Sequence, residues 1–321
     1  MLRYVVRRLL QMIPLLLGVT ILSFLVIQLS PGDFLSEIRL NPVVSQQTVD
    51  QMRADFGLDQ PLYIQYLKWV RNIVRGDFGY SFAFQVPVLF LIRSRLFNTL
   101  LLNLVALTFA WMIALPVGIT AATRQYTAID NATSLTAYIG ISTPTFFSAL
   151  LFLYFAFKTR LLPIGGMTSL DYDDFTWLGK VLDVAHHLVI PVVVVGFLSI
   201  AGLMRQVRGN LLEVLRQDYV KTARSKGLAE RVVLRKHALR NAINPLITIF
   251  GFELGGLLGG SAILENVIGW PGLGQLILRS VLAKDLYVVM GSLLIAAVTL
   301  VLGNLAADVL LALTDPRIRY D

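Results

Sequence analysis

The sequence contains no cysteine, few histidines and few charges, and each scarcity excludes a class of function. Without cysteine in its 321 residues, the chain has no disulfide framework, thiolate metal site or cysteine nucleophile. Its three histidines, including the adjacent His186 and His187, form no spaced ligand motif and give metalloenzyme chemistry little support. Charged residues make up 15% and hydrophobic residues 56%, with a mean hydropathy of +0.69. Soluble domains have about 25% charged residues, so this composition indicates an integral membrane protein.

Six long apolar runs approach the roughly 20 residues that cross a bilayer. The first follows Arg3, Arg7 and Arg8 and is too long for a cleaved secretory signal, so we expect an uncleaved helix with its N-terminus inside. In the fourth and shortest run, Pro191 is expected in the first helical turn, where a missing N–H costs nothing. The sequence therefore predicts an all-α membrane protein with six spans and both termini cytoplasmic. The runs cover residues 9–29, 99–122, 134–157, 188–204, 246–264 and 286–312.

The net charge of +8 is explained by this topology. The loops expected inside hold sixteen basic and six acidic residues, whereas those expected outside hold twelve of each. This asymmetry follows the positive-inside rule. Membrane lipid is therefore the expected neighbour of the basic charge, and a nucleic-acid partner is not expected.

The expected outside segment 30–98 is too long for a simple connection. Within it, residues 60–70 space apolar and aromatic side chains as a helix does. Two interpretations stay open: an amphipathic helix on the membrane with Tyr66 and Trp69 at the headgroup level, or a surface for a partner protein. The expected division is a first helix in 1–29, the segment 30–98, a core of five spans in 99–312 and a tail at 313–321.

The expected inside loop 205–245 carries ten basic residues and a helical pattern. Asp218 is expected to cap a short helix or place its charge at the positive end, and Gly227 to supply the left-handed turn that ends it. A second helix is expected from about Ala229 to Arg240. A helix–turn–helix DNA reader has a similar outline, but this loop is tethered to the bilayer at both ends. A docked partner and a solvated basic loop attracted to anionic lipid are the remaining interpretations.

This loop resembles the cytoplasmic signature of binding-protein-dependent ABC importer permeases, which reads E-A-A, three residues, G, nine residues, I-x-L-P. The run D-Y-V-K-T-A-R-S-K-G-L at 218–228, followed by H-A-L-R-N-A-I-N-P at 237–245, is similar to the oligopeptide, dipeptide and nickel branch. Lys221-Thr222-Ala223, Gly227 and Leu239 lie at the expected spacing, and the departures from the consensus are Lys221 and Thr222 for E-A, His237 for I and Arg240 for P. Further marks of the branch are Arg7-Arg8-Leu9 to Pro14, Pro31-Gly32-Asp33, Gly76-Asp77-Phe78-Gly79, Glu265, Trp270-Pro271-Gly272-Leu273-Gly274 and Asp315-Pro316-Arg317-Ile318-Arg319.

The resemblance implies a type I ABC importer permease fold in the bacterial inner (plasma) membrane. It implies a second, related permease subunit, two ATP-binding cassette subunits and an extracytoplasmic solute-binding protein as partners. The chain has no G-x-x-x-x-G-K-[ST] motif, so ATP hydrolysis, with its ATP and Mg, is expected in the cassette subunits. The chain itself is expected to be no enzyme and to bind no cofactor or metal directly.

Peptides are the substrate class that the resemblance favours. Nickel, glutathione and oligosaccharides are carried by the same branch and stay as alternatives. The alternative from another class is an ion-coupled secondary carrier, for which more ionisable groups inside the spans are expected.

By the resemblance, the helix near 218–227 transmits motion from the ATPase subunits. Tyr219, Thr222 and Ala223 are expected to form its docking face, and Gly227 to set its exit angle. Lys226 is equally well explained as a positive-inside charge. The complete set of expected coupling residues is Asp218, Tyr219, Thr222, Ala223, Lys226, Gly227, Leu228 and Leu239.

The fifth expected span holds two features of interest. Glu253 is the one acidic residue deep in a span, where a charge is expensive, so it is a candidate for the translocation path or for pairing with a partner subunit. Gly251, Gly255 and Gly259 recur every four residues and form a face where another helix can approach closely. Helix packing or a subunit interface is favoured over a solute path for these glycines.

A turn rich in proline and glycine follows the fifth span. Pro271, Gly272 and Gly274 indicate a rigid corner. By the resemblance, this turn and Glu265 before it are expected near the surface that contacts the binding protein. Trp270 is equally well explained as an anchor at the membrane interface.

Overall fold

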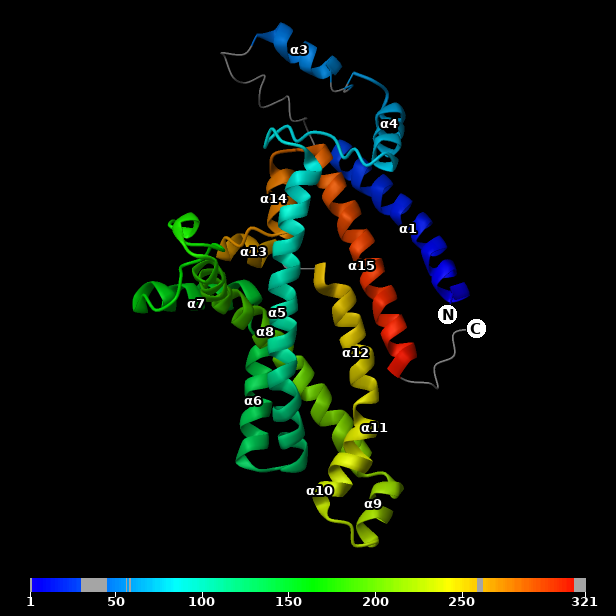
Figure 1. Ribbon diagram of the computed structural model, residues 1–321, viewed down its shortest axis with the longest axis vertical. Coiled ribbons are helices and arrows are strands. Elements are labelled where there is room, and N and C mark those ends of the chain that lie inside the picture. The colour runs from blue at the N-terminus through cyan, green and yellow to red at the C-terminus, as the bar shows by residue number, and fades with distance from the viewer. Residues whose placement is uncertain (1, 30–44, 56, 58, 259–261, 315–321) are drawn as a thin grey trace. The chain divides into compact units, whose positions relative to one another are not determined.

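The computed structural model describes residues 2–29, 45–55, 57, 59–258 and 262–314, and these are mainly helical (Figure 1). They contain one isolated antiparallel bridge, between Tyr80 and Pro87. The chain divides into two compact units. Unit 1 holds Met1–Thr99 and Pro271–Val301, and unit 2 holds Leu100–Trp270 and Leu302–Asp321.

Four helices of the described chain are long and apolar enough to cross a bilayer. A fifth crossing results when two helices that meet at 104° are counted together. The expected total of six membrane-spanning helices therefore stays a prediction. The four spans are Val6–Leu29 of α1 (Leu2–Leu29), α5 (Val88–Thr123), α8 (Trp177–Leu215) and Leu286–Val309 of α15 (Leu286–Thr314), and the bent pair is α6 (Ala128–Ser142) with α7 (Thr145–Thr159).

The expected third span is bent because a proline interrupts it. Pro144 has no N–H to continue the helix, and it disfavours the helical conformation of the preceding residue. Thr143 accordingly has an extended backbone, with φ −91° and ψ 123°. Residues 134–157 therefore do not form one straight helix.

The expected fifth span is also not one continuous helix in the described residues. Helix α12 (Asn244–Gly255) has 12 residues, about 18 Å at 1.5 Å per residue, whereas the hydrocarbon core is about 30 Å thick. A 3-10 turn, η3 (Gly256–Leu258), follows it. Residues 259–261 are outside the described part, and α13 (Ala262–Ile268) comes after them.

Helix α8 begins well before the apolar run that predicted it. Thr176 caps it by accepting a hydrogen bond at Oγ1 from the Gly179 N–H, at 3.3 Å. Pro191 is thus inside the helix, and the expectation of a first-turn proline is wrong. The reason is that the helix includes polar residues such as Lys180 and Asp183, which the hydropathy pattern assigned to a loop.

Unit 1 contains the helix expected at 60–70, which is α4 (Leu62–Val74). Trp69 is only 5% exposed and belongs to a buried cluster with Phe24 of α1 and Met290 of α15. The Tyr66 hydroxyl lies 2.9 Å from Thr20 Oγ1. The interpretation of Trp69 as a headgroup anchor is therefore wrong, because its ring packs inside the unit. The described residues of unit 1 also form the short helices α3 (Gln46–Asp55) and α14 (Leu273–Leu282).

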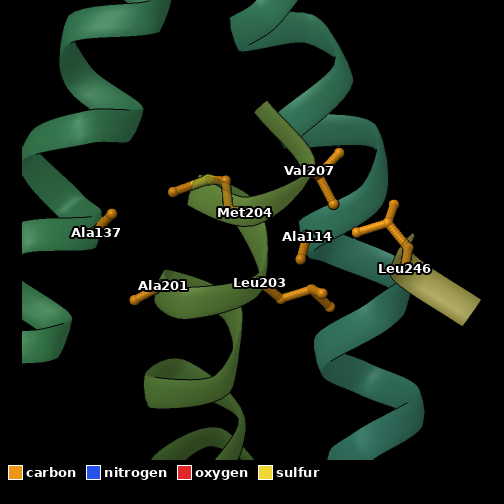
Figure 2. Close-up of a cluster of buried hydrophobic side chains, with 7 residues drawn as sticks. All are labelled: Ala114, Ala137, Ala201, Leu203, Met204, Val207 and Leu246. Carbon is orange, nitrogen blue, oxygen red and sulfur yellow. The ribbon is translucent and has the colours of Figure 1, made fainter. Parts of the chain in front are cut away.

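In unit 2, small residues bring the helices close together. The Cβ of an alanine at Gly118 of α5 would lie 2.8 Å from Val207 Cβ of α8, and one at Gly140 of α6 would lie 2.9 Å from Ala201 Cβ. Close packing at small residues is how membrane helices associate. Figure 2 shows the core between α5, α6, α8 and α12, formed by Ala114, Ala137, Ala201, Leu203, Met204, Val207 and Leu246.

Candidate functional site

The loop after α8 contains the short helix that the sequence predicts, α9 (Asp218–Ser225) (Figure 1). Gln217 is its N-cap, and Asp218 lies in the first helical turn. The Asp218 Oδ1 accepts a hydrogen bond from Lys221 Nζ at 2.9 Å. Of the two expected roles for Asp218, the observed one is a negative charge at the positive end of the helix.

Gly227 ends this helical region with the left-handed backbone that the sequence predicts. Its φ is +74°, and its N–H donates to the Arg224 carbonyl at 2.9 Å. A Cβ at this position would meet nothing within 4 Å. Glycine is therefore required here for its backbone conformation and not for space.

The second expected helix of the loop is present and includes a wider turn. It consists of α10 (Glu230–Val232), the π-helical segment η2 (Val233–Leu239) and α11 (Arg240–Ala242). π-Helical turns are rare and are frequent at functional sites. Ala238 and Ala242 share a buried cluster with Ala122 of α5 and Leu211 of α8, and Leu239 packs against that cluster. The loop is thus fastened to two long helices.

One face of α9 is apolar and packs inside the loop. Val220 and Val233 are fully buried, and Ala223 is 5% exposed. The expectation that Ala223 forms part of the docking face is therefore wrong, because its methyl group packs against the second helix. The face that remains accessible carries Tyr219, 44% exposed, and Thr222. After the end of α9, Lys226 and the apolar side chain of Leu228 are also exposed.

An ion pair closes the turn between the two helices. Arg224 donates from Nε to Glu230 Oε2 at 3.1 Å and from a terminal nitrogen to Oε1 at 2.6 Å. The Arg224 guanidinium lowers the pKa of the Glu230 carboxyl below its usual value. This bidentate pair connects the end of α9 to the start of α10 across Gly227.

A second ion pair, buried on its acidic side, joins the first turn of α6 to α8. Arg208 donates from Nε to Asp130 Oδ1 at 2.6 Å and from a terminal nitrogen to Oδ2 at 2.9 Å. The Asp130 side chain is 3% exposed and also accepts from the Tyr126 N–H. The sequence analysis missed this pair. The available signal was that Asp130 is the one acid in the expected inside loop 123–133.

Glu253 lies on α12 and has a partner within its own unit. Its Oε2 accepts a hydrogen bond from Trp111 Nε1 of α5 at 2.6 Å, and the Trp111 ring meets Phe250 edge-on at 5.1 Å. The carboxylate is thus held between two helices by a donor that the sequence analysis did not single out. Its part in the translocation path stays a prediction.

The glycines of the fifth expected span are described only in part. Gly251 is buried in α12, and Gly255 is the last residue of that helix. Gly259 lies outside the described residues. A packing role for this set stays a prediction.

Residues on each side of the turn after α13 are held within their own unit by packing or by hydrogen bonds. In unit 2, Glu265 is buried, and Trp270 is fully buried in a cluster with Leu102 and Leu188. Trp270 is therefore packed inside the protein and does not serve as an interfacial anchor, as one interpretation proposed.

In unit 1, hydrogen bonds fasten the start of α14. The Pro271 carbonyl accepts from Asn98 Nδ2 at 2.9 Å, and the Leu273 N–H donates to Thr99 Oγ1 at 2.7 Å. Gly272 is the N-cap of α14, and Gly274 lies in its first turn.

Comparison with known families covers nearly all of the chain. The model of the "Binding-protein-dependent transport system inner membrane component" matches residues 114–320, and the corresponding N-terminal model matches residues 1–103. The chain belongs to this family. It is a permease component and a multi-pass protein of the inner membrane, and its family works with a solute-binding protein.

Named relatives match this permease from end to end. It is 44% identical over 319 residues to the oligopeptide transport system permease protein AppB of Bacillus subtilis, and the match covers 99% of each chain. It is 34% identical to the dipeptide transport system permease protein DppB of Escherichia coli K12, with 100% and 99% covered. It is 37% identical to the glutathione transport system permease protein GsiC of Escherichia coli O1:K1, with full coverage of both.

Two solved structures support the fold of the permease. An inward-facing MetNI methionine ABC transporter structure aligns with a TM-score of 0.53 at 24% identity, over 71% of this chain and 97% of that one. An amino acid ABC transporter crystallised with histidines gives a TM-score of 0.52 at 20% identity, over 71% and 94%. The type I ABC importer permease fold is thus confirmed.

Proposed function

We propose that this permease is one of two transmembrane subunits of an ATP-driven importer that carries peptides across the inner membrane. The names of its relatives support a peptide as the solute, since the oligopeptide and dipeptide permeases match it over their full lengths. The glutathione permease, which is also a relative, acts on a molecule that is itself a peptide derivative. The substrate class is therefore short peptides, delivered by an extracytoplasmic binding protein.

The observation that carries the proposal is the construction of α9. Its inner face is buried through Val220 and Ala223, and its outer face presents Tyr219 and Thr222. A helix fastened in this way moves as one piece with the spans behind it. When two cassette subunits close on ATP and push against this face, the displacement reaches α8 and α12 and switches the subunit between inward-open and outward-open states.

In this mechanism the permease binds no nucleotide. ATP and Mg belong to the two cassette subunits, each of which receives the loop of one permease, and a related but distinct second permease completes the path. The six-span topology with cytoplasmic termini is part of the proposal, because it brings the basic loop 205–245 to the side where ATP is available. Glu253 is the residue we assign to the path.

The first test is purification of the tagged chain from membranes of cells that express the complete importer. We expect a second permease and ATPase subunits to co-elute, and the eluate to hydrolyse ATP. Reconstituted with the binding protein, it should take up a labelled dipeptide only when ATP is supplied. A Gly227→Pro variant should lose this coupling, because proline fixes φ near −65° and removes the N–H that binds Arg224.

The matched control is Gly209→Ala. Gly209 lies in α8, and a Cβ there meets nothing within 4 Å, so the variant should behave as the wild type. A chain that elutes alone, without ATPase activity, under conditions where a known importer survives would contradict the proposal. It would favour an ion-coupled carrier, with Glu253 as the first residue to test.

A further inference from the structure

A polar cavity of about 280 Å³ lies within unit 1, between α4, the loop that follows it and the start of α15. Its volume is close to the lower end of small-ligand sites, about 300 to 1,000 Å³. All of its lining except Tyr287 comes from the segment 30–98, to which the coupling mechanism assigns no task. The side chains that line it include Gln60, Lys68, Trp69, Asn72, Asp77 and Tyr287.

Two of these lining residues have a buried polar atom without a hydrogen-bond partner in the described part of the chain. They are Trp69, through its indole Nε1–H, and Gln60, through its side-chain Oε1. Trp69 is only 5% exposed, so bulk water does not satisfy this donor. Buried polar groups are nearly always paired in native proteins, and an exception calls for a missing partner.

The two atoms are complementary to one chemical group. The indole N–H needs an acceptor, and the amide Oε1 needs a donor. A peptide group supplies both, through its carbonyl oxygen and its N–H. The cavity therefore has the hydrogen-bonding pattern of an amide binding site.

The charged residues of the lining extend this pattern to the ends of a short peptide. Lys68 and Asp77 carry opposite charges and are both exposed. A zwitterion with an ammonium group at one end and a carboxylate at the other matches this pair. A loop of a partner protein also supplies amides, but it has no charged termini, so the charges favour a free peptide.

We propose that this cavity binds a short peptide with free termini. Trp69 Nε1 donates to the peptide carbonyl, and Gln60 Oε1 accepts from the peptide N–H. Asp77 receives the ammonium group, and Lys68 the carboxylate. The inference rests on the proposed function, which makes peptides the solute and brings segment 30–98 to the outside, and it adds a peptide site on the permease itself.

The test uses the purified importer complex in lipid nanodiscs, without the binding protein, and alanylalanine as the probe in calorimetric titration. The variant Asp77→Asn removes the charge but keeps the oxygen that accepts from the Gly79 N–H. We expect alanylalanine to bind the wild type and to bind this variant about tenfold more weakly, since a hydrogen bond to a charged group is lost. N-acetylated, amidated alanylalanine should bind the wild type about tenfold more weakly for the same reason.

The matched control is Asp59→Asn. Asp59 is a neighbouring exposed acid that does not line the cavity, so this variant should bind alanylalanine with the affinity of the wild type. Trp69→Phe keeps a packed ring and removes the N–H, so it should also weaken binding several-fold. Because Trp69 belongs to a buried cluster, the exposed Asp77 variant keeps the test informative if Trp69→Phe unfolds.

Absent binding, or binding that Asp77→Asn leaves unchanged, would overturn the inference while ATP-driven dipeptide uptake by the same complex leaves the proposed function intact. Loss of affinity for the purified binding protein in these variants, with no alanylalanine binding, would also overturn it and assign the cavity to a protein contact. Loss of uptake in the wild-type complex would instead refute the proposed function.

Discussion

At the level of single residues, the fold and the proposed docking face of the loop 205–245 depend on which side chains face inward and which face outward. Neighbouring positions on α9 have opposite surroundings: Val220 is fully buried, and Tyr219 is 44% exposed. Substitutions at these two positions therefore separate stability from docking.

Val220→Ala should loosen the loop, because it removes two buried methyl groups at a cost of about 1 to 3 kcal/mol. Tyr219→Ala should leave the loop as stable as the wild type and reduce the amount of ATPase subunit retained on purification. Hydrogen exchange of the 218–233 amides measures the first effect, and subunit stoichiometry the second. Equal behaviour of the two variants would show that α9 has no distinct outer face.

The buried pair of Asp130 and Arg208 should be sensitive to removal of either partner. Arg208→Met leaves the buried Asp130 carboxylate without its counter-charge, which costs about 3 to 5 kcal/mol, whereas Asp130→Asn leaves the partly exposed Arg208 and should cost less. The double variant should be less destabilised than the sum of the two. A double-mutant cycle on the thermal midpoint checks this, and simple additivity would mean that the pair does not act as a unit.

The exposed pair of Arg224 and Glu230 predicts a weak pH dependence. Because the pKa of Glu230 is lowered in the folded loop, its contribution is complete above the ordinary glutamate pKa of about 4.3 and is lost as pH falls through the folded-state pKa. The pair is largely exposed, so the effect stays below about 1 kcal/mol. Exchange protection of the Gly227 amide should differ between the wild type and Glu230→Gln at neutral pH, and the difference should vanish as pH falls through the folded-state pKa of Glu230. A difference that grows on acidification would contradict this.

Single positions were predictable from the sequence where the backbone demands one residue type. Gly227 is such a case, since a left-handed turn at a helix end nearly requires glycine. That Ala223 faces inward was not predictable in the same way, because its burial depends on packing against Val233, ten residues further along the loop. The Asp130 and Arg208 pair joins residues 78 positions apart, and one sequence has no local pattern for it.

At the level of helices, apolar length predicted the crossings better than their ends or breaks. Hydropathy located the apolar parts of α1, α5 and α15, but it set the start of α5 at residue 99, whereas the helix begins at Val88 and includes Arg93 and Arg95. It did not reveal the start of α8, because the capping residue Thr176 precedes eleven residues of mixed polarity. The bend at Pro144 follows from proline chemistry, but its angle of 104° depends on how α6 and α7 pack on the rest of unit 2.

The contact between α5 and α8 supplies a prediction at this scale. Gly118→Ala places a Cβ 2.8 Å from Val207 and 2.9 Å from the Met204 carbonyl, which is backbone and cannot rotate away. We expect a loss of about 1 to 3 kcal/mol from overpacking. Gly202→Ala on α8 is the control, since a Cβ there meets nothing within 4 Å. The thermal midpoint of the detergent-solubilised chain distinguishes them, and equal midpoints would contradict close packing at Gly118.

At the level of the whole molecule, the absence of cysteine makes the topology directly measurable. A single cysteine at Tyr63 of α4 or at Leu228 after α9 provides one reactive thiol at an exposed position without further changes to the chain. With an impermeant maleimide on intact spheroplasts, Tyr63→Cys should react and Leu228→Cys should not. Both should react after the membrane is opened. Labelling of Leu228→Cys in intact cells would refute the proposed orientation.

In the proposed importer, the construction of the loop 205–245 is also expected to affect how fast the subunits assemble. In the described residues, the buried face of α9 packs against Val214 and Leu215 of α8 and Val233 of the second helix, so we expect α9 to be folded before an ATPase subunit binds. An ATPase subunit then meets a preformed surface and spends little of its binding energy on ordering the chain. In the proposed importer we therefore expect subunit association to be limited by encounter and orientation rather than by folding of the loop, and cassette subunits to exchange without refolding of the permease.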